Sequence, residues 1–162
     1  MARITMTAQP VQSEKEFESV VREIIAEGIS SQFPQIYALS NKKAVDILIC
    51  RDGPRPKIFF IEVKFHKAAH GRLGFGGSSG SGFQPELLHR RPHYFEENMR
   101  WVLGDEEHPD QFWFLDNETI RSYVAGGKIG SKFNNIQKRM FQEEQWKTRE
   151  ELLATLLKWL NE

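Results

Sequence analysis

The sequence has a single cysteine, no long apolar run and no excess of charge of either sign. Having only Cys50 excludes a disulfide within the chain and a zinc site built from several cysteines. This thiol lies in an apolar segment, so we expect it to be buried and structural. The N-terminal residues lack a signal-peptide pattern and no segment is long enough to span a membrane. We therefore expect a cytoplasmic protein without membrane contact, in a reducing compartment.

Charge is balanced overall, with 22 basic and 22 acidic residues. A net charge of zero argues against a surface that is basic all over, which is the usual footprint of nucleic-acid binding. The charges are nevertheless segregated along the chain. Residues 64–72 and 89–93 are basic and contain no carboxylate, whereas carboxylates gather at 105–107 and 143–144. This pattern is compatible with a basic cleft in a neutral protein.

The length of 162 residues, with 40% hydrophobic and 27% charged residues, suits one globular unit with an ordinary core. We expect a single domain over residues 1–162, with a loose N-terminal arm at 1–12 and a C-terminal helical extension at 132–162. Residues 71–84 are rich in glycine and serine, which is typical of a linker or a flexible loop. Too little chain precedes them for a separate domain, so we expect a loop beside the working face.

Hydrophobic periodicity and turn residues predict the elements. Ser13 and Glu16 form a capping box at the start of a helix over residues 13–28, which has an apolar stripe and ends at Gly28. Strands are expected at 36–39, 45–50 and 57–65, and the turn at 51–56 makes the last two an antiparallel hairpin. Further helices are expected at 92–103, 132–146 and 148–160, the last with a capping box at Thr148 and Glu151, and a strand at 111–115.

This order predicts an α/β fold with a mixed central sheet. The helical crossover between the third and fourth strands should make those two strands parallel, whereas the hairpin is antiparallel. Both faces of the hairpin are apolar, which indicates helices on both sides of the sheet. C-terminal helices complete the expected architecture.

Three charged residues interrupt the apolar hairpin. If the turn is centred at Pro54, Asp46 lies opposite Glu62 and Ala44 lies opposite Lys64, so both carboxylates and the ammonium project from one face. A register shift by one residue would place them on opposite faces. Charges on an otherwise buried strand pair are costly unless something compensates for them.

A hard divalent cation would compensate for these charges. Mg²⁺ takes one or two carboxylates and fills its other positions with water and phosphate oxygens. Bound there, it would polarise a phosphodiester and lower the pKa of a water molecule. A lysine two residues beyond Glu62 would stabilise charge that develops during the attack. The alternative is that Asp46, Glu62 and Lys64 form ordinary salt bridges at the edge of a strand, without a metal ion.

Asp46, followed sixteen residues later by the run Ile61-Glu62-Val63-Lys64, resembles the signature of the PD-(D/E)XK nuclease superfamily. That superfamily includes type II restriction endonucleases, Mrr-like enzymes and archaeal Holliday-junction resolvases. Its αβββαβ core, the restriction-endonuclease-like fold, has the element order deduced above for residues 13–116. The C-terminal helices lie outside the resemblance. One departure is that Val45, rather than proline, precedes Asp46.

The resemblance implies roles for individual residues. Asp46, Glu62 and the backbone carbonyl of Val63 would hold Mg²⁺ or, in its place, Mn²⁺, and Lys64 would be catalytic. Many members add a glutamate from the first helix, and Glu18 borders the apolar stripe there. Glu14, one turn earlier, is the second choice for this additional ligand. The alternative for Glu18 is an ordinary solvent-exposed charge on the helix.

The function implied is that of a magnesium-dependent endodeoxyribonuclease acting on double-stranded or branched DNA. A small type II restriction endonuclease that works as a homodimer is the first choice, because the 71–84 loop and the helical tail would supply recognition and dimerisation. A Holliday-junction resolvase or DNA-repair nuclease is the closest rival. A rival of another class is a non-catalytic nucleic-acid-binding or assembly protein on the same fold.

Basic and amide side chains near the hairpin are the candidates for DNA contact. They would bind phosphates without reading sequence, although Gln84 could instead read a base edge or touch the site. The alternative for the basic residues at 66–72 is an ordinary polar loop. The alternative for those at 89–93 is the exposed surface at the start of a helix. The predicted contacts are His66, Lys67, His70 and Arg72, then Gln84, and then Arg90 and Arg91.

Overall fold

A computed structural model of the chain describes residues 11–30, 32, 36–40, 45–70, 72–75, 83–126, 129 and 135–162. The expected N-terminal arm falls outside the described residues except for its last two positions. Most of the expected 71–84 loop also falls outside them. Its described parts are a short strand at 72–74 and the start of a helix at Phe83, so regular structure enters the loop from both ends.

The centre of the fold is a five-stranded mixed sheet in the order β1-β2-β3-β5-β6. Its strands are β1 (Ile36–Ser40), β2 (Ile47–Arg51), β3 (Lys57–His66), β5 (Met99–Asp105) and β6 (His108–Leu115). The β3–β5 pair is parallel and the other three pairs are antiparallel. A second, two-stranded antiparallel sheet joins β4 (Arg72–Gly74) to β7 (Asn135–Gln137).

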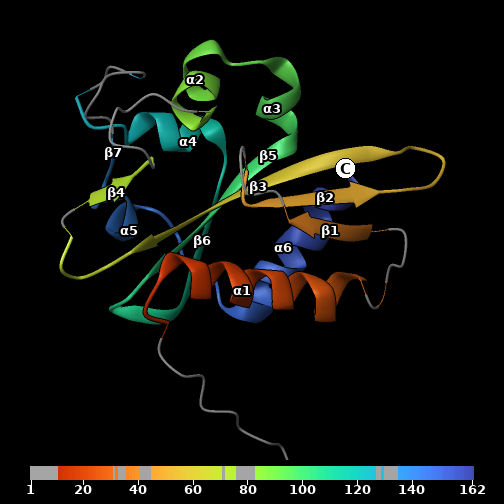
Figure 1. The fold of residues 1–162 in the computed structure, drawn as a ribbon, viewed down its shortest axis with the longest axis horizontal. Coiled ribbons are helices and arrows are strands. Elements are labelled where there is room, and N and C mark those ends of the chain that lie inside the picture. Colours follow the sequence, from red (N-terminus) through yellow and green to blue (C-terminus); the bar gives the residue numbers. More distant parts are fainter. Residues whose placement is uncertain are drawn as a thin grey trace, which may run out of the picture.

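Helices lie on both faces of the sheet, and Figure 1 shows it nearly edge-on between α2, α3 and α4 above and α1 and α6 below. One core joins α1 and α6 to the sheet, and the other joins α2, α4 and α5 to its opposite face. The α/β class with a mixed, helix-flanked sheet is thus confirmed. The helical elements are α1 (Glu14–Ile25), the π-helical turn η1 (Ala26–Ser30), α2 (Phe83–Arg90), α3 (His93–Asn98), α4 (Asn117–Ser122), α5 (Met140–Glu143) and α6 (Arg149–Asn161).

Helix α1 begins where the capping residues predict. The Ser13 hydroxyl accepts from the Glu16 N–H, and the Glu16 carboxylate accepts from the N–H of Gln12. The predicted end at Gly28 is wrong, because the chain continues through η1 to Ser30. A Cβ at Gly28 would lie 2.6 Å from a methyl carbon of Leu153, so the glycine serves close packing against α6.

The hairpin has the predicted register. Leu48 lies opposite Phe60 and Cys50 opposite Ile58. The face that carries Ile47 and Ile61 is fully buried, as expected. The other face is less covered than expected near the turn, since Ile58 is exposed and Cys50 is only half-buried.

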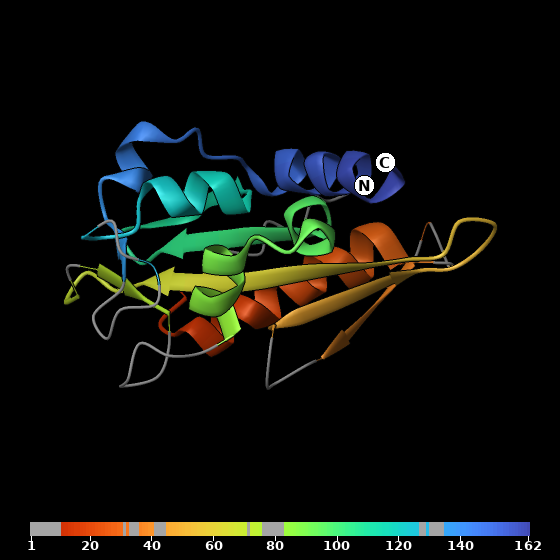
Figure 2. The ribbon, with the colours of Figure 1, turned by 90° about the horizontal axis from the view of Figure 1, so that it is seen from above.

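Strand β3 extends beyond its neighbour β5 at the end near the hairpin turn. There the hydroxyl of Tyr94, on α3, accepts from the N–H of Ile58 at 3.3 Å and donates to its carbonyl oxygen at 2.9 Å. A phenol therefore takes the place of a neighbouring strand at this edge. Figure 2, seen from above, shows α3 over this part of the sheet.

Two of the predicted helices are wrong in part. The helix expected over 92–103 ends at Asn98, and β5 follows it, because Trp101, Val102 and Leu103 are buried between the two helical layers. The parallel partner of β3 is thus β5, and the expected strand at 111–115 belongs to β6, which is antiparallel. Within 132–146 the described residues form β7 and the short α5, because pairing with β4 overrides helix propensity.

Helix α6 confirms the last predicted helix. Its Thr148 hydroxyl accepts from the Glu151 N–H, and the Glu151 carboxylate accepts from the Thr148 N–H. Of the helices in the described part of the chain, none has both the length and the apolar character needed to cross a bilayer.

Candidate functional site

The three charged residues of the hairpin lie close together at the end of the hairpin away from its turn, where β3 extends beyond the first residue of β2. Strand β2 begins at Ile47, opposite Ile61, whereas β3 continues to His66. Asp46 immediately precedes β2, and its Oδ2 accepts from the backbone N–H of Val63 at 2.7 Å. A carboxylate thus continues the hydrogen bonding of the hairpin beyond the end of the strand, so Asp46 is held against β3.

Glu62 and Lys64 form a buried ion pair on β3. They lie on the same face, two residues apart, with relative exposures of 1% and 5%. The Lys64 Nζ is 2.9 Å from Oε1 of Glu62. The same oxygen accepts from Nε2 of Gln84 on α2 at 2.8 Å. The other oxygen, Oε2, is buried and has no partner among the described residues.

Burial controls the electrostatics of this pair. Removal from water raises the pKa of Glu62 to about 7, and the negative charge of Asp46 adds to the rise, while Lys64 opposes it. Burial alone would lower the pKa of Lys64, but the charges of Glu62, Glu14 and Asp46 outweigh it and raise that pKa. Lys64 therefore stays charged, whereas Glu62 changes its protonation near neutral pH.

Helix α1 brings Glu18 and Glu14 to the same end of β3. Burial raises the pKa of the Glu18 carboxyl, and the neighbouring charge of Asp46 contributes to the increase. Arg22 links this helix to the hairpin, because its Nη2 donates to Glu18 Oε2 at 3.0 Å and to the Asp46 carbonyl oxygen at 3.1 Å. Glu14 is more exposed and lies 4.0 Å from the Lys64 ammonium. Glu18 is thus closer in environment to Asp46, and Glu14 to Lys64.

The residues at this site fit a divalent cation in part. Among the described residues, no group of three or more histidine, cysteine or carboxylate side chains is set to hold a metal ion. Mg²⁺ needs only one or two carboxylates, however, since water and substrate complete its shell. The unpartnered Oε2 of Glu62, beside the charge of Asp46, is the kind of buried oxygen that a cation would satisfy. Val63 contributes its N–H to Asp46, and the role of its carbonyl stays a prediction.

The predicted DNA contacts fall into different environments. Arg72, Arg90 and Arg91 are exposed, as is His70, and Lys67 is half-buried. Arg91 lies 3.8 Å from Glu118. Gln84 touches the site through Glu62, which was one of its two predicted roles.

His66 has a different environment from the one predicted. Its ring is buried, with Nδ1 2.9 Å from Oδ1 of Asp105 and Nε2 against the carbonyl oxygen of His70. A ring without exposed surface does not contact DNA in this arrangement. His66 instead fastens the segment after β3 to the end of β5, because its own carbonyl also accepts from the Glu106 N–H.

Arg22 is the site residue that sequence reasoning missed. Its spacing of four residues from Glu18 was a usable signal for an ion pair on one helix face. The bond from Arg22 to the Asp46 carbonyl joins residues distant in the chain, so no local pattern announces it.

No family model matches the chain, and neither a curated protein nor a solved structure matches it. The resemblance to the PD-(D/E)XK superfamily therefore rests on the residues themselves and on the arrangement described above.

Proposed function

We propose that this protein is a magnesium-dependent nuclease that hydrolyses DNA phosphodiester bonds. The observation that carries the proposal is the buried pair Glu62 and Lys64, which stands beside Asp46 with one carboxylate oxygen left unpartnered. A purely structural ion pair has no need of a second carboxylate or of an unsatisfied oxygen. Perturbed carboxyls that gather at one edge are typical of functional sites.

The roles of the chain's residues follow from their positions. Asp46 and Glu62 would hold the cation. Glu18 on α1 would join them as a third ligand only after a shift of its side chain, because the three carboxylates do not form a ready metal group among the described residues. When bound, the cation would polarise the phosphodiester and acidify a water molecule. Lys64 would stabilise negative charge at the scissile phosphate with its ammonium. Gln84 holds the Glu62 carboxylate in place, and Arg22 holds the Asp46 backbone.

The element order supports the same proposal. From α1 to β5 the chain forms one helix, three antiparallel strands, a helical crossover and a parallel strand, apart from the turn η1 and the short β4, which pairs in the second sheet. This order resembles that of the αβββαβ restriction-endonuclease-like core, with Asp46 just before the second strand and Glu62 and Lys64 on the third. The order supports the nuclease function by analogy, because one fold can host several activities.

Within this class we propose a small type II restriction endonuclease, acting as a homodimer in the cytoplasm. Two copies would place two sites across a duplex. The exposed Arg72, Arg90 and Arg91 are the residues we propose for phosphate contact, together with Lys67 and His70. Such contacts would make binding strongly dependent on salt.

The test is incubation of the purified protein with supercoiled plasmid, with and without Mg²⁺. We expect metal-dependent cleavage that Lys64→Ala reduces by about a thousandfold, the size typical of losing a key electrostatic stabiliser. Lys57→Ala, on the same strand at the other end of the hairpin, is the matched control and should retain full activity. Thermal denaturation of each variant shows whether it folds.

The products distinguish the members of the class. A restriction enzyme would give discrete fragments, whereas a resolvase would cut four-way junctions without base preference. DNA binding without metal-dependent cleavage, unchanged by Lys64→Ala, would overturn the nuclease and favour a non-catalytic binding protein.

A further inference from the structure

A concave site lies between the β5–β6 turn and α5, near the end of β3 that carries the proposed catalytic residues. It is a pocket of about 480 Å³, within the range of small-ligand sites. Its aromatic lining consists of Trp113, Phe141 and Trp146. Hydrogen-bonding side chains, among them His108, Gln111 and Gln142, complete the wall.

Trp146 is the feature of this pocket that needs an explanation. It is 44% exposed, one of three large hydrophobic residues that are exposed in the described part of the chain. Its backbone is fixed, because the adjacent Lys147 exchanges two hydrogen bonds with Phe112 on β6, at 2.8 and 3.0 Å. An indole held in water on a fixed backbone, at the mouth of an aromatic pocket, is arranged to stack against a ligand.

The other two rings give the pocket a firm inner wall. Phe141 packs edge-on against Trp113, with ring centroids 4.6 Å apart, and also contacts the buried ring of His66. The Trp113 indole donates to the carbonyl oxygen of Glu144. The inner wall is therefore rigid and apolar, which suits a flat ring.

The carboxylates around the pocket are engaged by neighbouring groups. Asp105 contacts His66 and His108, each at 2.9 Å. Glu107 pairs with Lys138 at 3.1 Å. Glu144 accepts from the Tyr123 hydroxyl. The remaining amides of Gln111 and Gln142 can both donate and accept, which suits the edge of a heterocyclic base better than a free anion.

The strand register places this pocket on the same face as the catalytic pair. Lys64 on β3 lies beside Leu103 on β5, and Leu103 lies opposite Trp113 on β6. Neighbouring strands are about 4.8 Å apart, so Trp113 stands about 10 Å from Lys64 across the sheet. That span is short on the scale of a DNA strand, whose axial rise in a duplex is about 3.4 Å per nucleotide, so one strand can reach both the catalytic pair and the pocket.

We propose that this pocket binds one unpaired nucleobase of the DNA strand, stacked on Trp146, a few nucleotides from the bond that is cut. The inference rests on the proposed nuclease function and adds to it a subsite for substrates that offer an unpaired or extruded base, such as branched DNA. Enzymes that extrude a base hold it between aromatic or apolar side chains and by hydrogen bonds to its edge. Stacking on an aromatic ring accepts any base.

The experiment measures binding of a single-stranded oligonucleotide that carries one 2-aminopurine, with Ca²⁺ in place of Mg²⁺ to prevent cleavage. We expect quenching of the 2-aminopurine fluorescence by wild-type protein. Trp146→Ala should weaken binding by about tenfold or more, the range measured for loss of one stacked base, and Trp146→Phe should restore most of it. Tyr94→Ala removes an exposed aromatic ring at the hairpin end of the sheet and should bind like wild type.

A fully paired duplex of the same sequence is the second arm. There Trp146→Ala should change binding less than twofold. Equal binding of the single strand by wild type and Trp146→Ala would overturn the pocket while leaving cleavage of plasmid, and hence the nuclease, intact. Conversely, base binding that depends on Trp146, without Mg²⁺-dependent cleavage, would support the pocket and overturn the nuclease.

Discussion

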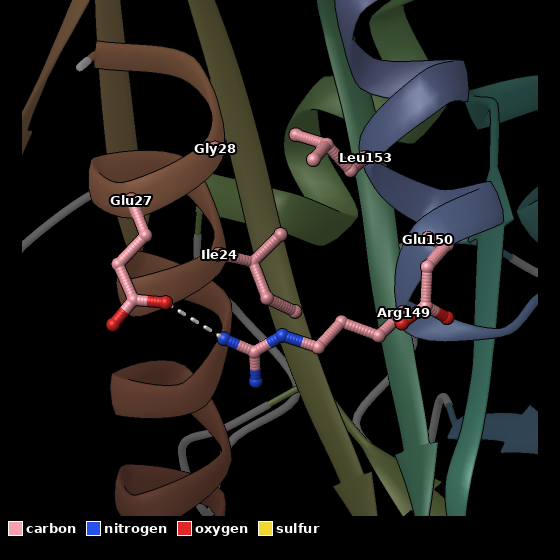
Figure 3. A pocket seen from close by; sticks show the side chains of 6 residues that line it. All are labelled: Ile24, Glu27, Gly28, Arg149, Glu150 and Leu153. Carbon is pink, nitrogen blue, oxygen red and sulfur yellow. Dashed lines mark hydrogen bonds and ion pairs between the residues drawn. The ribbon is translucent and has the colours of Figure 1, made fainter. Parts of the chain in front are cut away.

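Two ion pairs with similar geometry occupy very different surroundings in this protein. Lys64 and Glu62 lie 2.9 Å apart and are almost fully buried on β3. Arg149 on α6 and Glu27 on η1 lie 3.2 Å apart at the surface, where they border a shallow pocket with Ile24 and Leu153 (Figure 3). Both pairs join unlike charges at hydrogen-bonding distance, so distance alone does not distinguish them.

The two pairs differ in burial, and burial is what shifts the pKa of Glu62 in the first pair away from its ordinary range. Water screens the Arg149 pair, and such exposed pairs contribute between about zero and 1 kcal/mol to stability. Burial away from water raises the pKa of the Glu62 carboxyl to about 7, and one of its oxygens has no partner among the described residues. The comparison teaches that the presence of an ion pair does not indicate a functional site. Loss of water and an unpartnered oxygen are the features that single out the Glu62 pair.

Asp46 offers the sharpest test of the buried side of this comparison. Asp46→Asn keeps an oxygen that accepts from the Val63 N–H but removes the charge, so we expect cleavage to fall by about a hundredfold or more with little change in melting temperature. Asp46→Ala loses the acceptor as well and should also lower the free energy of unfolding by about 1–3 kcal/mol. Plasmid cleavage and thermal denaturation measure the two effects. Equal melting temperatures for both variants would contradict the assigned hydrogen bond.

The titration of Glu62 should set the metal requirement of the site. Below pH 7 a proton occupies the carboxyl and competes with the cation, so each unit of pH below 7 should raise the Mg²⁺ needed for half-maximal cleavage by about tenfold. Titrations with Mg²⁺ at pH 6 and pH 8 measure this shift. The same requirement at both pH values would contradict the role of Glu62 as a ligand.

The same titration has a consequence for stability without metal. The native carboxyl keeps its proton up to about pH 7, whereas the unfolded chain releases it near the ordinary glutamate pKa of 4.5. The native state thus binds more protons between these values, so the free energy of unfolding should fall as pH rises through this window. Glu62→Gln should remove this part of the pH dependence.

A smaller effect is expected from a change in the core that supports the site. A Cβ at Gly104 on β5 would lie 2.6 Å from ring atoms of the buried Phe17. Gly104→Ala should therefore cost about 1–3 kcal/mol of unfolding free energy through overpacking. Denaturation in urea measures it. Because Phe17 lies between Glu14 and Glu18 on α1, cleavage should fall as well, and an unchanged stability would mean that α1 moves freely away from the sheet.

The exposed pair should give the smallest effect. Arg149→Ala removes the contact with Glu27 in water and should change the free energy of unfolding by less than about 0.5 kcal/mol, with no effect on cleavage. Urea denaturation in low and high salt checks this expectation. A loss as large as that of Gly104→Ala would show that the contact between η1 and α6 depends on the ion pair rather than on the packing of Leu153.

Local patterns predicted much of the fold because the residues that determine it are close in sequence. The caps at Ser13 and Thr148 and the hairpin register at Leu48 and Phe60 were all readable, since turn chemistry and alternation set them. The exchange of a helix for β5 at 99–105 was not, because Met99 to Leu103 become a strand by pairing with β3.

The candidate site divides in the same way. Alternation along β3 and the hairpin register predicted that Asp46, Glu62 and Lys64 would meet. The contacts of Arg22 with the Asp46 carbonyl and of His66 with Asp105 join segments whose proximity only the folded chain defines. Such long-range contacts decide which side chains are exposed. The polar neighbours of His66 in the sequence predict an exposed ring, whereas its contact with Asp105 buries it.

The two overhanging ends of β3 are closed by side chains rather than by strands: the Tyr94 phenol at one end and the Asp46 carboxylate at the other. Open strand edges recruit strands from other molecules and so promote aggregation. The Tyr94 phenol caps its end of the strand without a charge, whereas Asp46 would combine this capping with the proposed binding of a cation. Asp46 would thus also protect this edge of β3 from non-specific strand pairing. A substitution that shortens its side chain would then increase aggregation as well as reduce the proposed activity.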